Sequence, residues 1–264
     1  MTQLIVAIVI PTHKSILNKD DLISLKHLKK YLNSYDKFFV IPENVDPKKF
    51  KQTGFRFIKF EDKYFESWRG YNELLLQKKF YEAFKRYTHI LIYQLDVLVF
   101  SDKLLDFCKK DYDYIAAPWF RPIIGSLSHK TDSPASGGNG GFSLRKVSSA
   151  LKVLEKVEKI ANRRSSNDKI RKFWFILALL LGKSHDIWLN APANHYPFAE
   201  DGFWSLEGPK YLSSYKVAPF KEALQFAFER FPRKCFKLNQ QRLPFGVHAW
   251  KKYDEEFWKP YILK

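Results

Sequence analysis

The chain has 264 residues, enough for one large domain or two small ones. Its formal net charge is +17, yet 45% of its residues are hydrophobic and 17% are aromatic. This composition excludes a disordered basic tail, because such tails lack the apolar side chains that a core needs. The positive charge favours an anionic partner, which is a nucleic acid, an anionic membrane or a phosphorylated ligand.

Cysteine content and apolar runs bear on where the protein works. Two cysteines, Cys108 and Cys235, are too few for a metal cluster or a disulfide scaffold and fit a reducing compartment, with a single disulfide left open. The first residues have no basic region before their apolar run and no small-residue cleavage site, which favours a buried strand over a signal peptide. The longest apolar run, Phe173–Gly182, has ten residues and is too short to span a bilayer. We therefore expect a cytoplasmic protein, either soluble or attached to a membrane surface.

The chain begins with a strand pattern followed by a helix pattern. The β-branched run Leu4–Ile10 predicts a strand that is buried on both faces. Asp20–Leu32 has an acidic start and a basic end, which suit a helix dipole. This helix is expected to bury one leucine face, made by Leu22, Leu25, Leu28 and Leu32.

The next segments continue the alternation. We expect strands over Lys37–Ile41 and Phe55–Phe60, a helix over Asn72–Tyr87 and a second buried strand over His89–Val99. Strands that alternate with helices predict an α/β fold with a largely parallel sheet. Ligands of such sheets bind beyond the carboxyl ends of the strands, and Asp96 lies close to one of these ends.

The second half of the chain has fewer regular elements. Tyr112–Trp119 predicts another strand, and Phe120–Gly141 predicts a loop rich in Gly, Ser and Pro. Order resumes at Phe142–Arg145, and Val147–Lys159 predicts a helix. No linker is long enough to divide the chain, so residues 1–264 are expected to form a single domain.

Two segments could bring backbone or charge to a ligand. Asp96 follows Tyr93, Gln94 and Leu95, and a carboxylate in such apolar company is expensive to bury unless a metal or a cation compensates it. A surface aspartate that caps the next turn fits the same pattern. The GGNGG motif at Gly137–Gly141 allows close approach of a ligand to the backbone, or forms a flexible turn.

Two later segments could supply acid–base or metal chemistry. Glu200 and Asp201 are adjacent carboxylates beside bulky aromatics, which can hold one acid at a raised pKa suited to a general base. Acidic residues at a helix N-terminus give the same pattern. His248, between a glycine turn and a tryptophan, is either a metal ligand or a core histidine.

Taken in order, five segments resemble one family. HILIYQLDVLVF, DYIAAPW, GGNGGFSLR, EDGFW and PFGVHAW together resemble the DUF5672-type bacterial glycosyltransferase domain, over roughly Leu4 to Trp258. The resemblance implies a GT-A fold, which is a Rossmann-type mixed, mainly parallel sheet flanked by helices. Residues of about 1–120 would form the nucleotide-sugar half, and about 121–264 the acceptor half. It also implies transfer of a sugar from a nucleotide-diphosphate donor, UDP-linked, to a saccharide or lipid-linked acceptor in bacterial surface polysaccharide synthesis.

The resemblance also implies roles for individual residues. The Asp-x-Asp motif of GT-A enzymes matches Gln94-Leu95-Asp96, in which Gln94 replaces the first acid and would bind the ribose or base. Asp96 and His248 would hold Mn²⁺ or Mg²⁺. Asp201 is the first choice and Glu200 the second for the base of an inverting reaction. The nucleotide would contact Thr12 and Lys14, and the sugar would contact Trp119, Gly138, Asn139, Gly140 and Trp204.

Other functions stay open at this stage. The charge and the aromatics would also serve a nucleic-acid-binding protein, although no helix-turn-helix, zinc finger or RNP motif is present. A non-catalytic carbohydrate-binding protein on the same fold is the second alternative. A basic loop before the apolar run Phe173–Leu181 suits the anionic inner face of a membrane, or forms the solvated start of a buried helix. Its charged residues are Arg163, Arg164, Lys169, Arg171 and Lys172.

Overall fold

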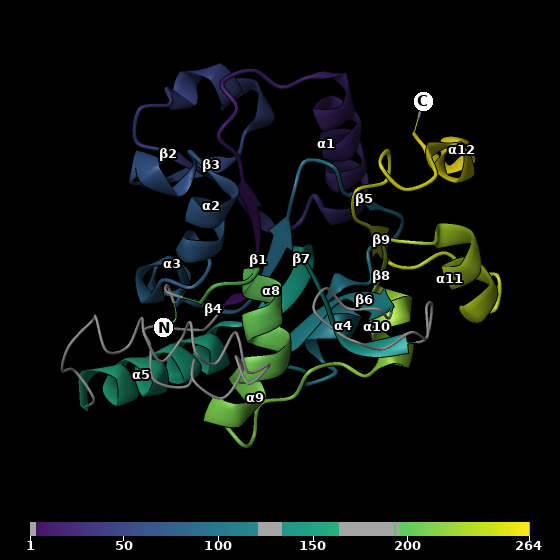
Figure 1. The fold of residues 1–264 in the computed structure, drawn as a ribbon. Coiled ribbons are helices and arrows are strands. Elements are labelled where there is room, and N and C mark those ends of the chain that lie inside the picture. The colour runs from purple at the N-terminus through teal and green to yellow at the C-terminus, as the bar shows by residue number, and fades with distance from the viewer. Residues whose placement is uncertain (1–3, 121–133, 164–192, 194–195, 264) are drawn as a thin grey trace.

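The protein is a mixed α/β fold, described here from a computed structural model (Figure 1). The structure describes residues 4–120, 134–163, 193 and 196–263. The strands are β1 (Leu4–Pro11), β2 (Asp36–Pro42), β3 (Arg56–Phe60), β4 (Tyr87–Tyr93), β5 (Leu98–Val99), β6 (Tyr114–Phe120), β7 (Pro134–Lys146), β8 (Ala227–Phe228) and β9 (Gly246–Val247).

Helices of different lengths connect these strands. The α-helices are α1 (Lys19–Leu32), α2 (Trp68–Leu74), α3 (Lys78–Glu82), α4 (Leu104–Cys108), α5 (Val147–Arg163), α8 (Glu200–Gly202), α9 (Gly208–Tyr211), α10 (Phe220–Phe226), α11 (Pro232–Leu238) and α12 (Glu255–Trp258). The 3₁₀ helices are η1 (Pro47–Thr53), η2 (Asp62–Tyr64) and η6 (Lys259–Tyr261), and a π-helical turn, η5 (Phe203–Glu207), joins α8 to α9. Within the described ranges, no helix is both long enough and apolar enough to cross a membrane.

A six-stranded sheet forms the centre of the fold, in the order β3-β2-β1-β4-β7-β6. Strands β1 to β4 pair in parallel, whereas β7 runs antiparallel to both of its neighbours. This confirms the expected mixed, mainly parallel sheet flanked by helices. A smaller sheet, β5-β9-β8, lies beside it next to α11 and α12 (Figure 1).

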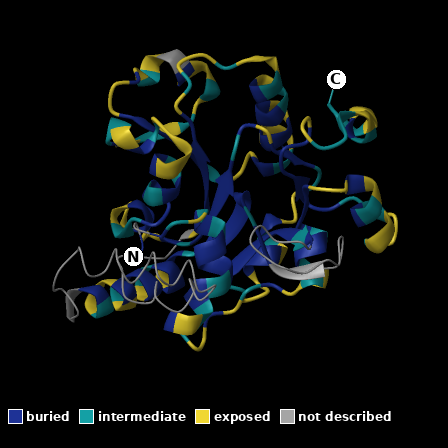
Figure 2. Cartoon of the chain, in the orientation of Figure 1, coloured by how far each residue is buried: buried dark blue, intermediate teal, exposed yellow. Residues whose placement is uncertain are grey.

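Strand β1 packs on both sides, as its apolar run predicts. Ala7 and Val9 lie in a core with α2, α3 and α5, whereas Ile8 and Ile10 lie in the opposite core with α1 and α4. Side chains alternate between the faces of a strand, so a strand covered on both faces must be apolar throughout. The buried colouring of the sheet in Figure 2 follows from this arrangement.

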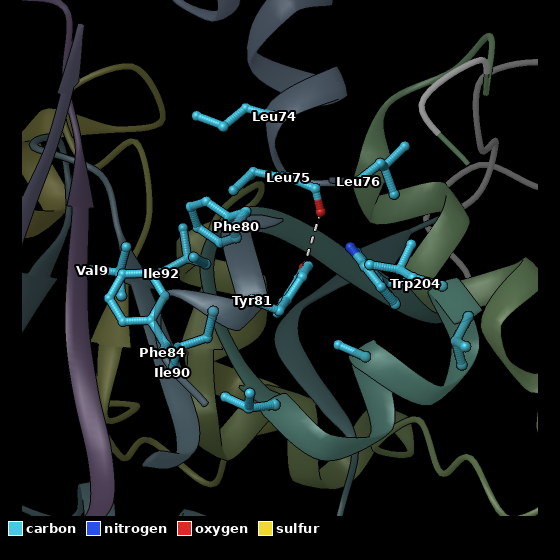
Figure 3. Packing of buried hydrophobic residues seen from close by; sticks show 14 of the residues in the cluster. Val9, Leu74, Leu75, Leu76, Phe80, Tyr81, Phe84, Ile90, Ile92 and Trp204 are labelled. Carbon is cyan, nitrogen blue, oxygen red and sulfur yellow. Dashed lines mark hydrogen bonds between the residues drawn. The ribbon is translucent and has the colours of Figure 1, made fainter. Parts of the chain in front are cut away.

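The predicted helix over Asn72–Tyr87 is wrong, because the structure has two short helices and an earlier strand start. Helix α2 ends at Leu74, α3 covers Lys78–Glu82, and Tyr87 already belongs to β4. The three leucines 74–76 are all buried, at 0 to 3% exposure. Consecutive residues of one helix face different directions, so the chain has to turn to bury all three (Figure 3).

The expected strand over His89–Val99 is also divided. Strand β4 ends at Tyr93, a turn closed by Val97 N–H donating to the Gln94 carbonyl follows, and β5 joins the smaller sheet. The turn places Gln94 and Asp96 beyond the carboxyl end of β4, which is where ligands of parallel sheets bind.

The GGNGG segment does not form the expected loop. It lies within β7, where Asn139 pairs with Ala117 and Gly138 with Pro118. A Cβ added to Gly138 would lie 2.4 Å from the Ala117 carbonyl oxygen. The glycines therefore permit a close strand pairing and not a flexible turn.

Smaller expectations gave mixed results. Leu22 is 53% exposed, so it is not on the buried face of α1, where Ser24 and His27 lie at 0%. Cys108 and Cys235 are both free and buried, so they form no disulfide. The basic loop and the apolar run Phe173–Leu181 lie outside the described residues, apart from Arg163 at the end of α5.

Candidate active site

Two adjacent glycines on β7 bring two groups of polar side chains together. A Cβ added to Gly140 would lie 2.0 Å from Glu200 Oε1. A Cβ added to Gly141 would lie 2.3 Å from His248 Nε2 and 2.6 Å from Gln94 Oε1. Because successive strand residues face opposite ways, each glycine makes room for a different group. We call these the Glu200 group and the His248 group.

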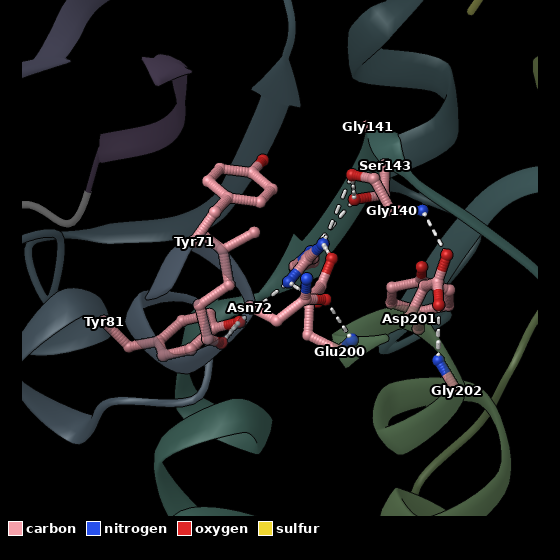
Figure 4. Close-up of polar contacts among 12 residues, drawn as sticks. Tyr71, Asn72, Tyr81, Gly140, Gly141, Ser143, Glu200, Asp201 and Gly202 are labelled. Carbon is pink, nitrogen blue, oxygen red and sulfur yellow. Dashed lines mark hydrogen bonds and ion pairs between the residues drawn. The ribbon is translucent and has the colours of Figure 1, made fainter. Parts of the chain in front are cut away.

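The Glu200 group is built on a buried ion pair between β7 and α8. Arg145 Nη1 and Nη2 donate to the two carboxylate oxygens of Glu200 at 2.7 and 2.8 Å, and both residues are at most 3% exposed (Figure 4). The guanidinium also donates to Tyr81 Oη at 3.0 Å and to Ser143 Oγ at 2.9 Å. Asn72 Oδ1 accepts the backbone N–H of Glu200 at 2.6 Å. Such complete pairing is what a buried ion pair needs to offset its desolvation.

Asp201 follows Glu200 and is held by backbone donors. Gly140 N–H donates to Oδ2 at 3.2 Å, and Gly202 N–H donates to Oδ1 at 2.7 Å (Figure 4). Burial, with a smaller contribution from the Glu200 charge, raises the pKa of Asp201 to about 7. A carboxyl group with such a pKa both accepts and releases a proton near neutral pH. The π-helical turn η5 begins two residues later, and such turns are frequent at functional sites.

The His248 group forms where the small sheet meets the end of β4. His248 Nδ1 lies 3.2 Å from Glu229 Oε1, and its Nε2 lies 3.0 Å from Gln94 Oε1 and 3.4 Å from Asp96 Oδ1. Gln94 Nε2 donates to Tyr71 Oη at 2.9 Å. Burial acts to lower the pKa of His248, but the hydrogen bond that His248 donates to Glu229 and the charges of Asp96 and Glu229 outweigh it, and the net pKa is raised.

Backbone contacts fix this second group. His248 N–H donates to the Phe228 carbonyl at 2.9 Å, which keeps the imidazole beside Glu229, the next residue after β8. The following residue, Ala249, has φ of 52°, in the left-handed region that non-glycine residues rarely adopt. Strain of this kind persists only where the surroundings enforce it, and it gathers at functional sites.

A divalent cation can be tested against these donors. Across the described ranges, no group of three or more His, Cys, Asp and Glu side chains is arranged to hold a metal ion. Asp96 and His248 alone converge, and the Asp96 side chain is 50% exposed. Mg²⁺ usually keeps several waters and binds one or two carboxylates plus substrate phosphates, so Asp96 supplies one ligand of this kind, and a cation held by Asp96 and His248 stays a prediction.

The predicted nucleotide contacts lie just after β1. Thr12 is buried, and its N–H donates to the Val40 carbonyl at 2.9 Å. Lys14 Nζ pairs with Asp21 at 2.6 Å, close to the start of α1. Thr12 and Lys14 contact Val40, Asp21 and each other, and not the Glu200 or the His248 group, so their assignment remains a prediction.

The predicted sugar contacts separate into two sets. Trp119 is half-buried and faces Gly137, where an added Cβ would lie 2.9 Å from its ring. The Gly138 carbonyl accepts from Tyr114 Oη, and Asn139 Oδ1 accepts Gly141 N–H at 2.9 Å. These residues lie on β6 and β7 beside the two groups.

Trp204 does not lie with them. It is 1% exposed and packs in the core, with its ring 5.3 Å from Tyr81 (Figure 3). The assignment as a sugar contact needs correction, because a side chain with no free surface stacks on no ligand. Trp204 belongs to η5, and its ring packs this turn against Tyr81 of α3 and against Tyr215.

Sequence reasoning missed four residues of the site: Tyr71, Asn72, Arg145 and Glu229. Arg145 carries the clearest signal, since an arginine follows Phe142, Ser143 and Leu144 in a strand, where it must be buried and paired. Glu229 ends the run QFAFE, and its apolar neighbours give the same indication. Tyr71 and Asn72 lie on an ordinary helix and carry no such signal.

The chain resembles known proteins in its fold, and it matches one family in its sequence. Three solved glycosyltransferases share part of the architecture. Apo GlyE of Streptococcus pneumoniae TIGR4 is 12% identical with a TM-score of 0.48, and the match covers 98% of this chain and 60% of GlyE. LgtC with donor and acceptor sugar analogs is 13% identical (TM-score 0.49; 92% of this chain and 86% of LgtC covered), and the mannosyltransferase Ktr4p of S. cerevisiae is 11% identical (TM-score 0.47; 83% of this chain and 67% of Ktr4p covered). The chain thus spans about 60% of the length of GlyE. A search of curated proteins gives no match. The family model described as "Protein of unknown function (DUF5672)" matches residues 54–248, a narrower range than Leu4 to Trp258, and the chain belongs to this DUF5672 family.

Proposed function

We propose that the protein is a glycosyltransferase that moves a sugar from a nucleotide-diphosphate donor to a hydroxyl of a saccharide or lipid-linked saccharide. The observation that carries this proposal is Asp201, a carboxyl group with a pKa of about 7 that accepts the Gly140 backbone N–H at 3.2 Å. Such a group is suited to take a proton from an acceptor hydroxyl at neutral pH.

The proposed reaction balances as a single displacement. Asp201 accepts the acceptor hydroxyl proton while that oxygen bonds to the anomeric carbon of the donor. The bond from this carbon to the diphosphate oxygen breaks, and the nucleoside diphosphate leaves with the electron pair. One displacement inverts the configuration, so we propose an inverting enzyme.

Glu200 is the weaker candidate for the base. Both of its oxygens accept from Arg145, so its lone pairs are engaged and its charge is compensated. It acts instead on Asp201, because its charge helps to raise the Asp201 pKa. We assign Glu200 a positioning role.

The His248 group would hold the diphosphate. Asp96 and His248 would bind a divalent cation, Mn²⁺ or Mg²⁺, which would neutralise the charge that develops on the leaving diphosphate. Gln94 would hydrogen-bond the ribose or base, Thr12 and Lys14 would contact the nucleotide, and Trp119 would offer its ring to the sugar. We further propose work at the cytoplasmic face of the membrane, in surface polysaccharide synthesis.

A thermal-shift screen of nucleotide sugars, UDP-linked ones first, tests the donor class. A donor that binds only the folded state raises the apparent stability, and Mn²⁺ should increase the shift. If no nucleotide sugar shifts the melting temperature with or without Mn²⁺, the proposal fails. Detection of donor hydrolysis or transfer would decide against a non-catalytic carbohydrate-binding protein.

Variants then test the base. Asp201→Asn should lower transfer by about 10²–10⁴-fold and keep donor binding, because only the proton acceptor is removed. Glu158→Gln on the exposed face of α5 is the matched control and should keep full activity. Near-full turnover of Asp201→Asn would refute the assignment. EDTA should inactivate the enzyme and Mn²⁺ or Mg²⁺ should restore it, and full activity in EDTA would remove the proposed metal site.

A further inference from the structure

A second hollow lies apart from the candidate active site, where α4, α10 and residues 238–245 meet. Its volume is about 450 Å³, within the range of pockets that hold small organic ligands. The side chains that line it are aromatic, aliphatic, hydroxyl, amide or cationic, and no Asp or Glu is among them.

Three cations face this hollow: Lys103, Lys221 and Arg242. All three are exposed, and none forms an ion pair with any residue that the structure describes. By contrast, Lys110 pairs with Glu222 and Arg233 with Asp254 in the same half of the chain. Three unpaired cations around one concavity attract a multiply charged anion, because they repel one another until an anion is bound.

The floor of the hollow is apolar. Phe107 and Phe245 are buried there with Leu224, and their rings lie 5.5 Å apart. At the rim Leu238 is 48% exposed, one of the few large hydrophobic side chains that the described chain leaves in solvent. An apolar floor beneath a cationic rim matches an amphiphile and not a simple anion.

The loop that carries Arg242 is held in an unusual conformation. Gln240 and Gln241 both line or adjoin the hollow and have φ of 56° and 55°, a region that non-glycine residues rarely adopt. Asn239 Nδ2 donates to the Arg242 carbonyl at 2.8 Å and fixes the turn. Two consecutive strained residues cost free energy, and such strain gathers at ligand sites.

The hollow is separate from the His248 group. Phe245 precedes His248 by three residues, about 10 Å in an extended chain. Phe142, Phe226 and Phe245 form an aromatic layer between them, with ring centroids 4.9 to 5.7 Å apart. A ligand in the hollow therefore does not need the donor site, and the inference does not rest on the proposed function.

We propose that this hollow binds an amphiphile with a phosphate or diphosphate head, which the three cations hold while the apolar part lies on the phenylalanine floor. A phosphate monoester carries close to two negative charges near neutral pH, which suits three cations. The head group belongs either to a dispersed molecule or to a membrane lipid, and the test separates these sources.

Titration calorimetry with decyl phosphate is the primary test. The wild type should bind it, and Lys103→Gln/Lys221→Gln/Arg242→Gln should bind it at least about tenfold more weakly, since three exposed charge contacts are lost. The matched control, Lys48→Gln/Lys51→Gln/Lys85→Gln, removes the same charge from exposed sites elsewhere and should change the affinity less than about twofold. Decyl maltoside should bind both triple variants equally.

Two further measurements locate the site and its source. Decyl phosphate should slow hydrogen exchange over residues 238–245 in the wild type and not in the hollow variant. Vesicles of phosphatidylcholine with phosphatidic acid, whose head is a phosphate monoester, should show the same loss of affinity if the head group comes from a membrane lipid, whereas loss with dispersed decyl phosphate and no binding to these vesicles would assign a dispersed ligand. An equal loss of decyl phosphate affinity in both triple variants, or no loss in either, overturns the proposal. Neither outcome affects the thermal-shift screen of nucleotide sugars, which tests the proposed function.

Discussion

The Glu200 group and the His248 group are neighbours on β7, but they differ in how they are built. The first is dry and fully paired, with Arg145 holding both oxygens of Glu200. The second is open on one side, where Asp96 is 50% exposed beside a buried imidazole. The closed group fixes the position of a proton acceptor, whereas the open group leaves room for phosphate, water or an ion. Gly140 and Gly141, facing opposite ways, let both be built from one strand.

Removal of Arg145 should have the largest effect on the closed group. Arg145→Ala leaves the Glu200 charge buried without a partner, and we expect a loss of about 3–5 kcal/mol in the free energy of unfolding. Urea denaturation measures it. Arg145→Met/Glu200→Gln removes both charges and should recover more than half of the loss. A single variant within about 1 kcal/mol of the wild type would show that the ion pair is not buried as described.

The two glycines give the most direct comparison of the groups. Gly140→Ala would push its Cβ against a carboxylate that Arg145 holds in place, so we expect a loss of about 2–3 kcal/mol. Gly141→Ala meets the ends of the His248 and Gln94 side chains, which can move, so about 1 kcal/mol is expected. Chemical denaturation of the two variants checks the order. Equal losses would mean that the two groups are equally rigid.

The contrast also explains how much of the protein could be predicted. The buried strand over Leu4–Ile10, the first part of the strand expected over His89–Val99 and the mixed sheet follow from local apolar runs, which dictate burial on both faces. Asp96, Asp201 and His248 were predicted from motifs, and the structure brings Asp96 to 3.4 Å from His248. Arg145, Glu229 and Tyr71 were missed because each pairs with a residue well away in the sequence, at separations of 55, 19 and 23 residues, and no local pattern records such pairings. The prediction of a glycine-rich loop was wrong for a related reason. The glycines are needed for close contacts with the neighbouring strand β6 and with Glu200 of α8, which the local sequence does not reveal.

Asp201 links stability to pH in the closed group. Its folded-state pKa of about 7 lies above its value of 3.8 in the unfolded chain, so the unfolded state loses its proton first as the pH rises. The free energy of unfolding should therefore fall by about 3 kcal/mol between about pH 4 and pH 7, and transfer activity should rise through about pH 7. In Asp201→Asn both dependences should weaken. Denaturation at a series of pH values tests this, and parallel curves for the two proteins would contradict the raised pKa.

The smallest predicted effect concerns the open group. Glu229→Gln keeps an acceptor near His248 Nδ1 but removes the charge, so the pKa of His248 should fall. A raised folded-state pKa stabilises the protein below the unfolded value of 6.5 and stops doing so as the pH rises through the folded value. The variant should therefore be less stable by about 1 kcal/mol at low pH and unchanged at high pH. Proton NMR titration of the histidines measures the shift, with His89 as internal reference because burial lowers its pKa to about 4. An unchanged His248 titration would mean that Glu229 does not set the charge of the open group, and Asp96 would then be its main partner.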